Sequence, residues 1–196
     1  MLRSDCSGSG APTLLLLPGL LCTQRLWDRA RPLLEAFHDV LTVDLPGVGG
    51  GDLPEGAADL EAYADRVCEV LDAVREHGVA AYADRQMPRT FREDAREEDV
   101  EAALRQARDW PEDAVVRALE AMRDRPDRTP LLLEHTELPV LLIQGDDDPA
   151  IDALDPEEGH VTRIVTDTAH MGVLTDPHTF AGIVHGWVAD ELERSA

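Results

Sequence analysis

The sequence predicts an α/β protein with a short, mostly parallel sheet flanked by helices. Four short apolar runs, each ended by turn-forming residues, have the length and composition of buried strands. Amphipathic segments separate most of these runs, and strands that alternate with helices favour parallel pairing. The predicted strands are Pro12–Leu17, Val40–Val43, Leu138–Gln144 and Val161–Val165. Right-handed crossovers then predict the spatial order second, first, third, fourth.

Helices are expected between and after these strands, because apolar residues recur there at helical spacing. The predicted core helices are Gln24–Phe37, about Ala58–His77 and about Pro177–Glu193. Four glycines among residues 47–51 predict a loop after the second strand, since glycine destabilises regular elements.

The composition changes between Gly78 and about Glu137, where no convincing strand occurs and Arg, Asp, Glu and Ala alternate. Short helices such as Glu97–Arg108 and Pro111–Arg123 are predicted there, since proline suits a helix start. We therefore expect three parts. They are a flexible N-terminus at 1–11, an α/β core formed by 12–77 and 138–196, and a helical lid or insertion at 78–137.

The 196-residue chain has 18 basic and 40 acidic side chains, a formal net charge of −22. This acidity disfavours nucleic acids and anionic membranes as partners, and the apolar run Leu14–Leu17 is too short to span a bilayer. Every basic residue is Arg, which excludes a Schiff-base lysine and a Walker-type phosphate loop. Three widely spaced cysteines without a CxxC pair predict neither a disulfide framework nor a zinc site, and a reduced, cytoplasmic setting fits best.

Ligands of parallel α/β sheets bind outside the carboxyl ends of the strands, where Asp148 and His170 follow the third and fourth strands. A carboxylate that accepts from one imidazole nitrogen leaves the other free to take a proton, so these residues form a candidate acid–base pair. The alternative is that His170 caps the last helix or satisfies loop backbone groups. The turn after the first strand offers the N–H groups of Leu20 and Leu21 as oxyanion donors, unless it is an ordinary turn.

Four motifs in this order resemble the α/β-hydrolase superfamily. They are Leu14–Leu21 followed by Trp27, then Val43–Gly49, then Val140–Asp148, and finally Ala169–Met171 followed by Asp176–Phe180. The resemblance covers most of residues 12–77 and 130–194. It implies the fold of that superfamily, with the oxyanion loop at Leu20 and Leu21, the catalytic acid at Asp148 and the catalytic histidine at His170.

The chain departs from this pattern where the superfamily places its G-x-S-x-G nucleophile elbow. The predicted second helix leads straight into lid-like sequence, so the elbow strand, its helix and the next strand are missing. The four serines all lie near the termini, and the stretch Cys6–Gly10 does not match the elbow. Cys22 could act as a nucleophile beside His170, although packing as a small apolar residue is favoured. Asp44 is either an alternative acid or, as favoured, a cap of the glycine-rich loop.

Metal or cofactor binding is not expected. The run Asp146, Asp147 and Asp148 suits a hard cation in residue type, but consecutive side chains point in different directions. His178 and His185 lie seven positions apart, whereas paired histidine ligands on a helix usually lie three or four apart. The large apolar side chains of 78–137 either pack the lid, which is favoured, or line a substrate pocket. They are Tyr82, Met87, Phe91 and Trp110.

Three hypotheses about function stay open. The first is an enzyme acting on a small, mostly apolar organic molecule, with His170, oriented by Asp148, as general base. Activation of water would give hydrolysis, which the resemblance favours, and removal of a substrate proton would give a cofactor-free lyase, cyclase or isomerase. The second is a non-catalytic binding protein in which a homodimer covers the sheet edges left by the missing strands. The third is a degraded gene product that folds poorly.

Overall fold

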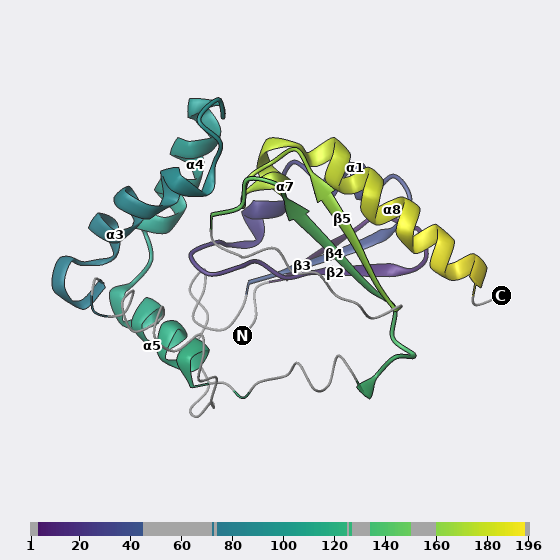
Figure 1. Ribbon diagram of the computed structural model, residues 1–196, viewed down its shortest axis with the longest axis horizontal. Helices are drawn as coiled ribbons and strands as arrows, with labels where there is room; N and C mark the ends of the chain where they lie inside the picture. Colours follow the sequence, from purple (N-terminus) through teal and green to yellow (C-terminus); the bar gives the residue numbers. More distant parts are fainter. Residues whose placement is uncertain are drawn as a thin grey trace.

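The computed structural model describes residues 4–44, 72, 74–124, 126, 134–149 and 160–194, and five strands form two small sheets within them (Figure 1). The strands are β1 (Ser4–Ser7), β2 (Thr13–Leu16), β3 (Asp39–Val43), β4 (Val140–Gly145) and β5 (Val161–Thr166). In the first sheet, β3 lies between β1 and β2; it is parallel to β2 and antiparallel to β1. In the second sheet, β4 and β5 are parallel. The predicted α/β class with a short, mostly parallel sheet is confirmed.

The strand β1 lies in the segment 1–11, for which the sequence predicts a flexible terminus. Its residues pair with β3 from Ser4 opposite Val43 to Ser7 opposite Val40. The Arg31 guanidinium also reaches this strand, with Nη1 at 2.7 Å from a carboxylate oxygen of Asp5. Backbone pairing and this ion pair order a polar segment that has no apolar pattern of its own.

The predicted order of one continuous sheet is wrong for the described residues. The first and second predicted strands are neighbours (β2 and β3), and so are the third and fourth (β4 and β5), but β2 and β4 share no ladder. Among the described residues, no strand joins the two sheets. The ring of Trp27 in η1 lies 5.8 Å from that of Phe180 in α8, and both rings line a cavity that Ile143 of β4 also borders.

The helices match the prediction best where the chain is strongly periodic. The described helices are η1 (Gln24–Trp27), α1 (Arg31–Leu34), α3 (Val79–Gln86), η2 (Met87–Thr90), α4 (Glu97–Arg108), α5 (Glu112–Arg123), α7 (Gly172–Thr175) and α8 (Pro177–Arg194). The single helix predicted over Gln24–Phe37 is wrong. Two short helices occupy that range, and Pro32, which cannot donate a backbone hydrogen bond, lies at the start of the second. Most of the helix predicted over Ala58–His77 lies outside the described residues.

Two apolar clusters form the core. The smaller one packs β2 and β3 against α1 and α8 and includes the fully buried Leu34 and Val40. The larger one joins helices α3, α4 and α5 to the turn after β2 and to α7. Figure 1 shows α8 beside the strands, with α3, α4 and α5 grouped at the other end of the molecule. The large apolar side chains of the predicted lid belong to this cluster and do not line the cavity beside α7 and α8.

Ion pairs also attach α4 to the rest of the protein. The carboxylate of Asp99 is nearly buried and lies 3.0 Å from Nη1 of Arg29 and 2.8 Å from Nη2 of Arg96. The same Arg29 nitrogen donates to the Leu174 carbonyl at the end of α7. None of the described helices is long and apolar enough to cross a membrane.

Candidate active site

His170 and Asp148 meet beyond the carboxyl ends of β5 and β4. Nδ1 of His170 lies 3.0 Å from Oδ2 of Asp148 and 3.2 Å from Oδ1. The Asp148 side chain is 6% exposed and the imidazole is 36% exposed. Because an ionised carboxylate only accepts hydrogen bonds, Nδ1 carries the proton and Nε2 is left as the basic nitrogen. The predicted contact between these two side chains is present.

Backbone hydrogen bonds join the loop after β4 to the loop after β5. The N–H of Asp146 donates to the Thr166 carbonyl at 2.9 Å, and the N–H of Asp147 donates to the Thr168 carbonyl at 3.2 Å. The loops approach so closely at Gly145 that a Cβ atom there would lie 2.2 Å from the Thr168 carbonyl oxygen. Only glycine lets the two loops close in this way, and their closure brings the acid and the imidazole together.

A cavity of about 190 Å³ lies beside this pair, among β4, β5, α7 and α8. Both Asp148 and His170 line it, so the pair borders a space for a small molecule. The apolar part of its wall includes Trp27, Ile143, Val173 and Phe180. The cavity can therefore hold a small, mostly apolar molecule next to a base.

Asp176 adds a negative charge to the wall of the same cavity. Hydrogen bonds from the Thr179 side chain and backbone N–H, the latter 3.1 Å long, hold the pKa of Asp176 below its ordinary value. The carboxylate is therefore ionised at neutral pH. Together with the net charge of −22, it disfavours anionic ligands in this cavity.

The predicted backbone donors, Leu20 and Leu21, are not among the residues that line this cavity. Their turn is closed by a hydrogen bond of 3.2 Å from the Cys22 N–H to the Gly19 carbonyl, and Leu21 has a φ of 59°. This left-handed conformation costs about 1–2 kcal/mol for a leucine. Burial of the Leu21 side chain in the larger cluster offsets that cost. An oxyanion role for the two N–H groups stays a prediction.

The other two candidates behave as packing and capping residues. Burial raises the pKa of the Cys22 thiol to about 11, so the thiol is protonated at neutral pH and a poor nucleophile. Asp44 is buried, and its Oδ1 accepts the Gln24 N–H at 2.7 Å. It therefore caps the first turn of η1. The glycine-rich loop for which this role was predicted lies outside the described residues.

The three consecutive aspartates after β4 do not converge. Oδ1 of Asp146 pairs with Arg92 at 2.9 Å, whereas Asp148 pairs with His170. Throughout the described part of the chain, no group of three or more His, Cys, Asp or Glu side chains is arranged to hold a metal ion. His185 of α8 contacts His38, with 3.1 Å between Nδ1 and Nε2.

Several residues of the site were not predicted for it. Trp27, Asp176 and Phe180 lie within or beside the motifs that carry the resemblance, so a signal for them existed. Arg92 had none, because its two ion partners, Asp146 and Asp167, lie more than fifty positions away along the chain. Only the folded chain reveals this contact.

Solved structures with the α/β-hydrolase fold match this chain over nearly its whole length, which shows that it has that fold. A thermophilic esterase from Thermogutta terrifontis has a TM-score of 0.77 and 20% identity, with 96% of this chain and 93% of that chain covered. The enol-lactonase from Burkholderia xenovorans LB400 has a TM-score of 0.77 and 17% identity, with 96% of each chain covered. An esterase from Exiguobacterium antarcticum has a TM-score of 0.75 and 14% identity, with 96% and 95% covered. No protein-family model matches the sequence.

Proposed function

We propose that this chain, with its α/β-hydrolase fold, hydrolyses small, mostly apolar esters or lactones, using His170 as a general base without a serine nucleophile. The observation that carries the proposal is the 3.0 Å contact between His170 and Asp148 at the wall of a cavity. An imidazole fixed in one tautomer can take a proton from a water molecule held there. The esterases and the lactonase among the similar structures support a carbonyl substrate.

The reaction has two steps. Nε2 of His170 removes a proton from water as the water oxygen bonds to the carbonyl carbon, and the carbonyl π electrons move onto the carbonyl oxygen. The negative charge of Asp148 stabilises the imidazolium that forms. The tetrahedral intermediate then expels its leaving oxygen, which takes the proton back from Nε2. The products are an acid and an alcohol from an ester, or one hydroxy acid from a lactone.

None of the described serines lines the cavity beside His170, so none of them is placed to act as its nucleophile. Ser4 and Ser7 belong to β1, and the Ser7 hydroxyl contacts Glu35 and Arg31, neither of which lines the cavity beside His170. The hydroxyl groups in the described wall of the cavity belong to Thr166, Thr168 and Thr179. Those of Thr166 and Thr168 pair with each other at 2.8 Å, and that of Thr179 bonds to Asp176, so we take water as the nucleophile that His170 activates. Positioned general acid–base catalysis contributes roughly 10²- to 10⁴-fold to a rate, so we expect a modest hydrolase.

The cavity limits the substrate by size and charge. Its volume of about 190 Å³ lies below the roughly 300–1,000 Å³ typical of pockets for drug-sized ligands. Its aromatic and aliphatic wall favours an apolar acyl or alcohol group. The ionised Asp176 disfavours substrates that carry a carboxylate or phosphate. Short, uncharged esters and small lactones are therefore the compounds to test.

The test is turnover of p-nitrophenyl acetate and of a small lactone by the wild-type chain and by His170→Ala. We expect kcat/KM to fall by about 10²- to 10⁴-fold in His170→Ala. His135→Ala is a matched control, because His135 forms a surface pair with Glu137 at 2.8 Å and is 52% exposed. Equal turnover by His170→Ala and wild type would refute the mechanism. A wild-type chain that binds these compounds without hydrolysing them would favour a binding protein, and proton exchange at carbon would favour a lyase or isomerase.

A further inference from the structure

The last residue of η2 and the segment that follows it touch both loops of the candidate active site. The Thr90 carbonyl accepts the N–H of Met171, the residue after His170, at 3.1 Å. Two residues further along, Nη1 of Arg92 lies 2.9 Å from Oδ1 of Asp146 and 2.7 Å from Oδ1 of Asp167. Arg92, which lies in the helical segment 78–137, thus contacts both the loop that carries Asp148 and the loop that carries His170.

We propose that Arg92 is a positioning residue, which holds the loops after β4 and β5 together so that Asp148 keeps its hydrogen bond to His170. This inference rests on the proposed function of the pair. Asp146 lies two residues before the acid, and Asp167 lies three residues before the imidazole. Separation of these two points would rotate Asp148 or His170 out of contact.

Charge favours this bridge. The charge of Arg92 interacts with four nearby carboxylates, those of Asp167, Asp146, Asp147 and Asp94. Without the guanidinium, the carboxylates of the two loops would repel each other. Backbone bonds and the contact of Asp148 with His170 would then have to hold the loops together.

The ion pairs are exposed enough to be tested without unfolding the protein. The Arg92 side chain is 35% exposed, and those of Asp146 and Asp167 are 49% and 89% exposed. Pairs of this kind add little to global stability. Both contacts are made by the single nitrogen Nη1, so a lysine ammonium can replace them, whereas a glutamine cannot.

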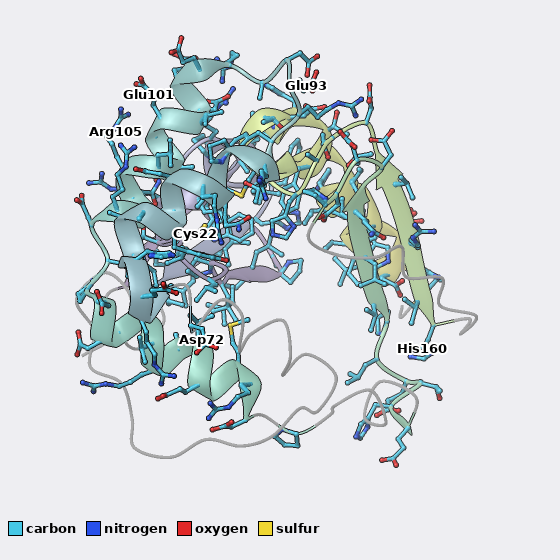
Figure 2. The ribbon with its side chains drawn as sticks, turned by 60° about the vertical axis from the view of Figure 1, so that its left-hand side comes forward. Cys22, Asp72, Glu93, Glu101, Arg105 and His160 are labelled. Atoms are coloured by element: carbon cyan, nitrogen blue, oxygen red, sulfur yellow. The ribbon has the colours of Figure 1, made fainter. Side chains whose placement is uncertain are left out.

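Arg105 provides a matched control. It lies on α4 and pairs with Glu101 at 3.4 Å, and both side chains are at least 60% exposed. Figure 2 shows Arg105 and Glu101 on the outer side of α4, whereas Glu93, the neighbour of Arg92 in sequence, lies where the helical region approaches the ends of β4 and β5. Arg105→Gln removes the same charge and a similar surface pair without touching the loops.

The experiment compares wild type with Arg92→Gln, Arg92→Lys and Arg105→Gln in the intact chain. The first readout is the NMR signal of the His170 Nδ1–H proton, assigned by its loss in His170→Gln. We expect this signal to broaden by exchange with water in Arg92→Gln and to persist in the other two variants. High salt should broaden it in wild type, because salt screens exposed pairs.

The second readout is ester hydrolysis, for which we expect kcat to fall about tenfold in Arg92→Gln with little change in KM. Thermal unfolding confirms that each variant is folded. An unchanged Nδ1–H signal in Arg92→Gln would overturn the inference. The NMR readout needs no turnover, so an inactive wild-type chain with an Arg92-dependent signal would count against the proposed function alone.

Discussion

Replacement of Asp148 by asparagine tests how much the acid contributes to the site. The change keeps the shape of the side chain and removes its charge, so the imidazolium formed during catalysis loses its partner. A hydrogen bond between charged groups contributes about 1.5–3 kcal/mol. We take about 1.5–2 kcal/mol here, because Asp148 is only 6% exposed but the imidazole is 36% exposed and partly screened by water. That energy corresponds to a loss of about 10- to 30-fold in kcat/KM.

The assay is initial-rate hydrolysis of p-nitrophenyl acetate, with Asp147→Asn as the control. Asp147 is exposed and contributes its backbone N–H to the loop contact, which the substitution leaves in place. If the amide introduced by Asp148→Asn donated to Nδ1, the imidazole proton would move to Nε2 and the loss would exceed this range. Equal rates for the two variants would refute the role of Asp148 as the partner of the imidazole.

Three further outcomes follow from the contacts of the folded chain. Gly145→Ala should lower the free energy of unfolding by about 1–3 kcal/mol and reduce activity, because its Cβ would lie 2.2 Å from a carbonyl oxygen; Gly182→Ala, with open space around it in α8, should not destabilise the protein in urea unfolding. Iodoacetamide at neutral pH should modify the exposed Cys6 and spare Cys22, whose pKa burial raises to about 11; peptide mapping that found Cys22 modified first would contradict this. Burial, and then the neighbouring His185, lower the pKa of His38 below 6.5, so the unfolded chain takes up this proton first. Stability should therefore fall as the pH drops below about 6.5, and urea unfolding between about pH 7.5 and 5.5 should show a smaller fall in His38→Gln.

The strands that the sequence predicts well are those that bury apolar runs. Val140–Gly145 and Thr13–Leu16 are dominated by Leu, Val and Ile, and each lies within a residue or two of its predicted range. The polar segment Ser4–Ser7 gives no such signal, because pairing with β3 and contacts with Arg31 order it. The single helix predicted across Pro32 is wrong because a proline inside a helix has no N–H to donate, and here it lies at the start of a new helix despite the apolar stripe around it.

The contact between Asp148 and His170 could be predicted because topology places the ends of parallel neighbouring strands together. Strand topology does not predict the cavity wall in the same way, since Trp27 and Phe180 belong to helices far apart in the sequence; for these two residues the motifs of the resemblance were the available signal. The role of Arg92 could not be predicted either, because an ion pair between residues far apart in the sequence leaves no pattern in the local sequence. The predicted sheet order is wrong for the described residues because no strand among them lies between β2 and β4 in a sheet, and the rule for consecutive strands needs such neighbours.

If His170 activates water directly, no side chain is acylated during turnover, and the mass of the protein tests this most directly. Wild-type protein is mixed with excess p-nitrophenyl acetate and quenched in acid at successive times. Mass spectrometry then gives the mass of the intact chain in each sample. We expect the mass of the unmodified chain at every time at which p-nitrophenol is being released. A transient gain of one acetyl group on any side chain, formed and lost at the rate of turnover, would contradict it.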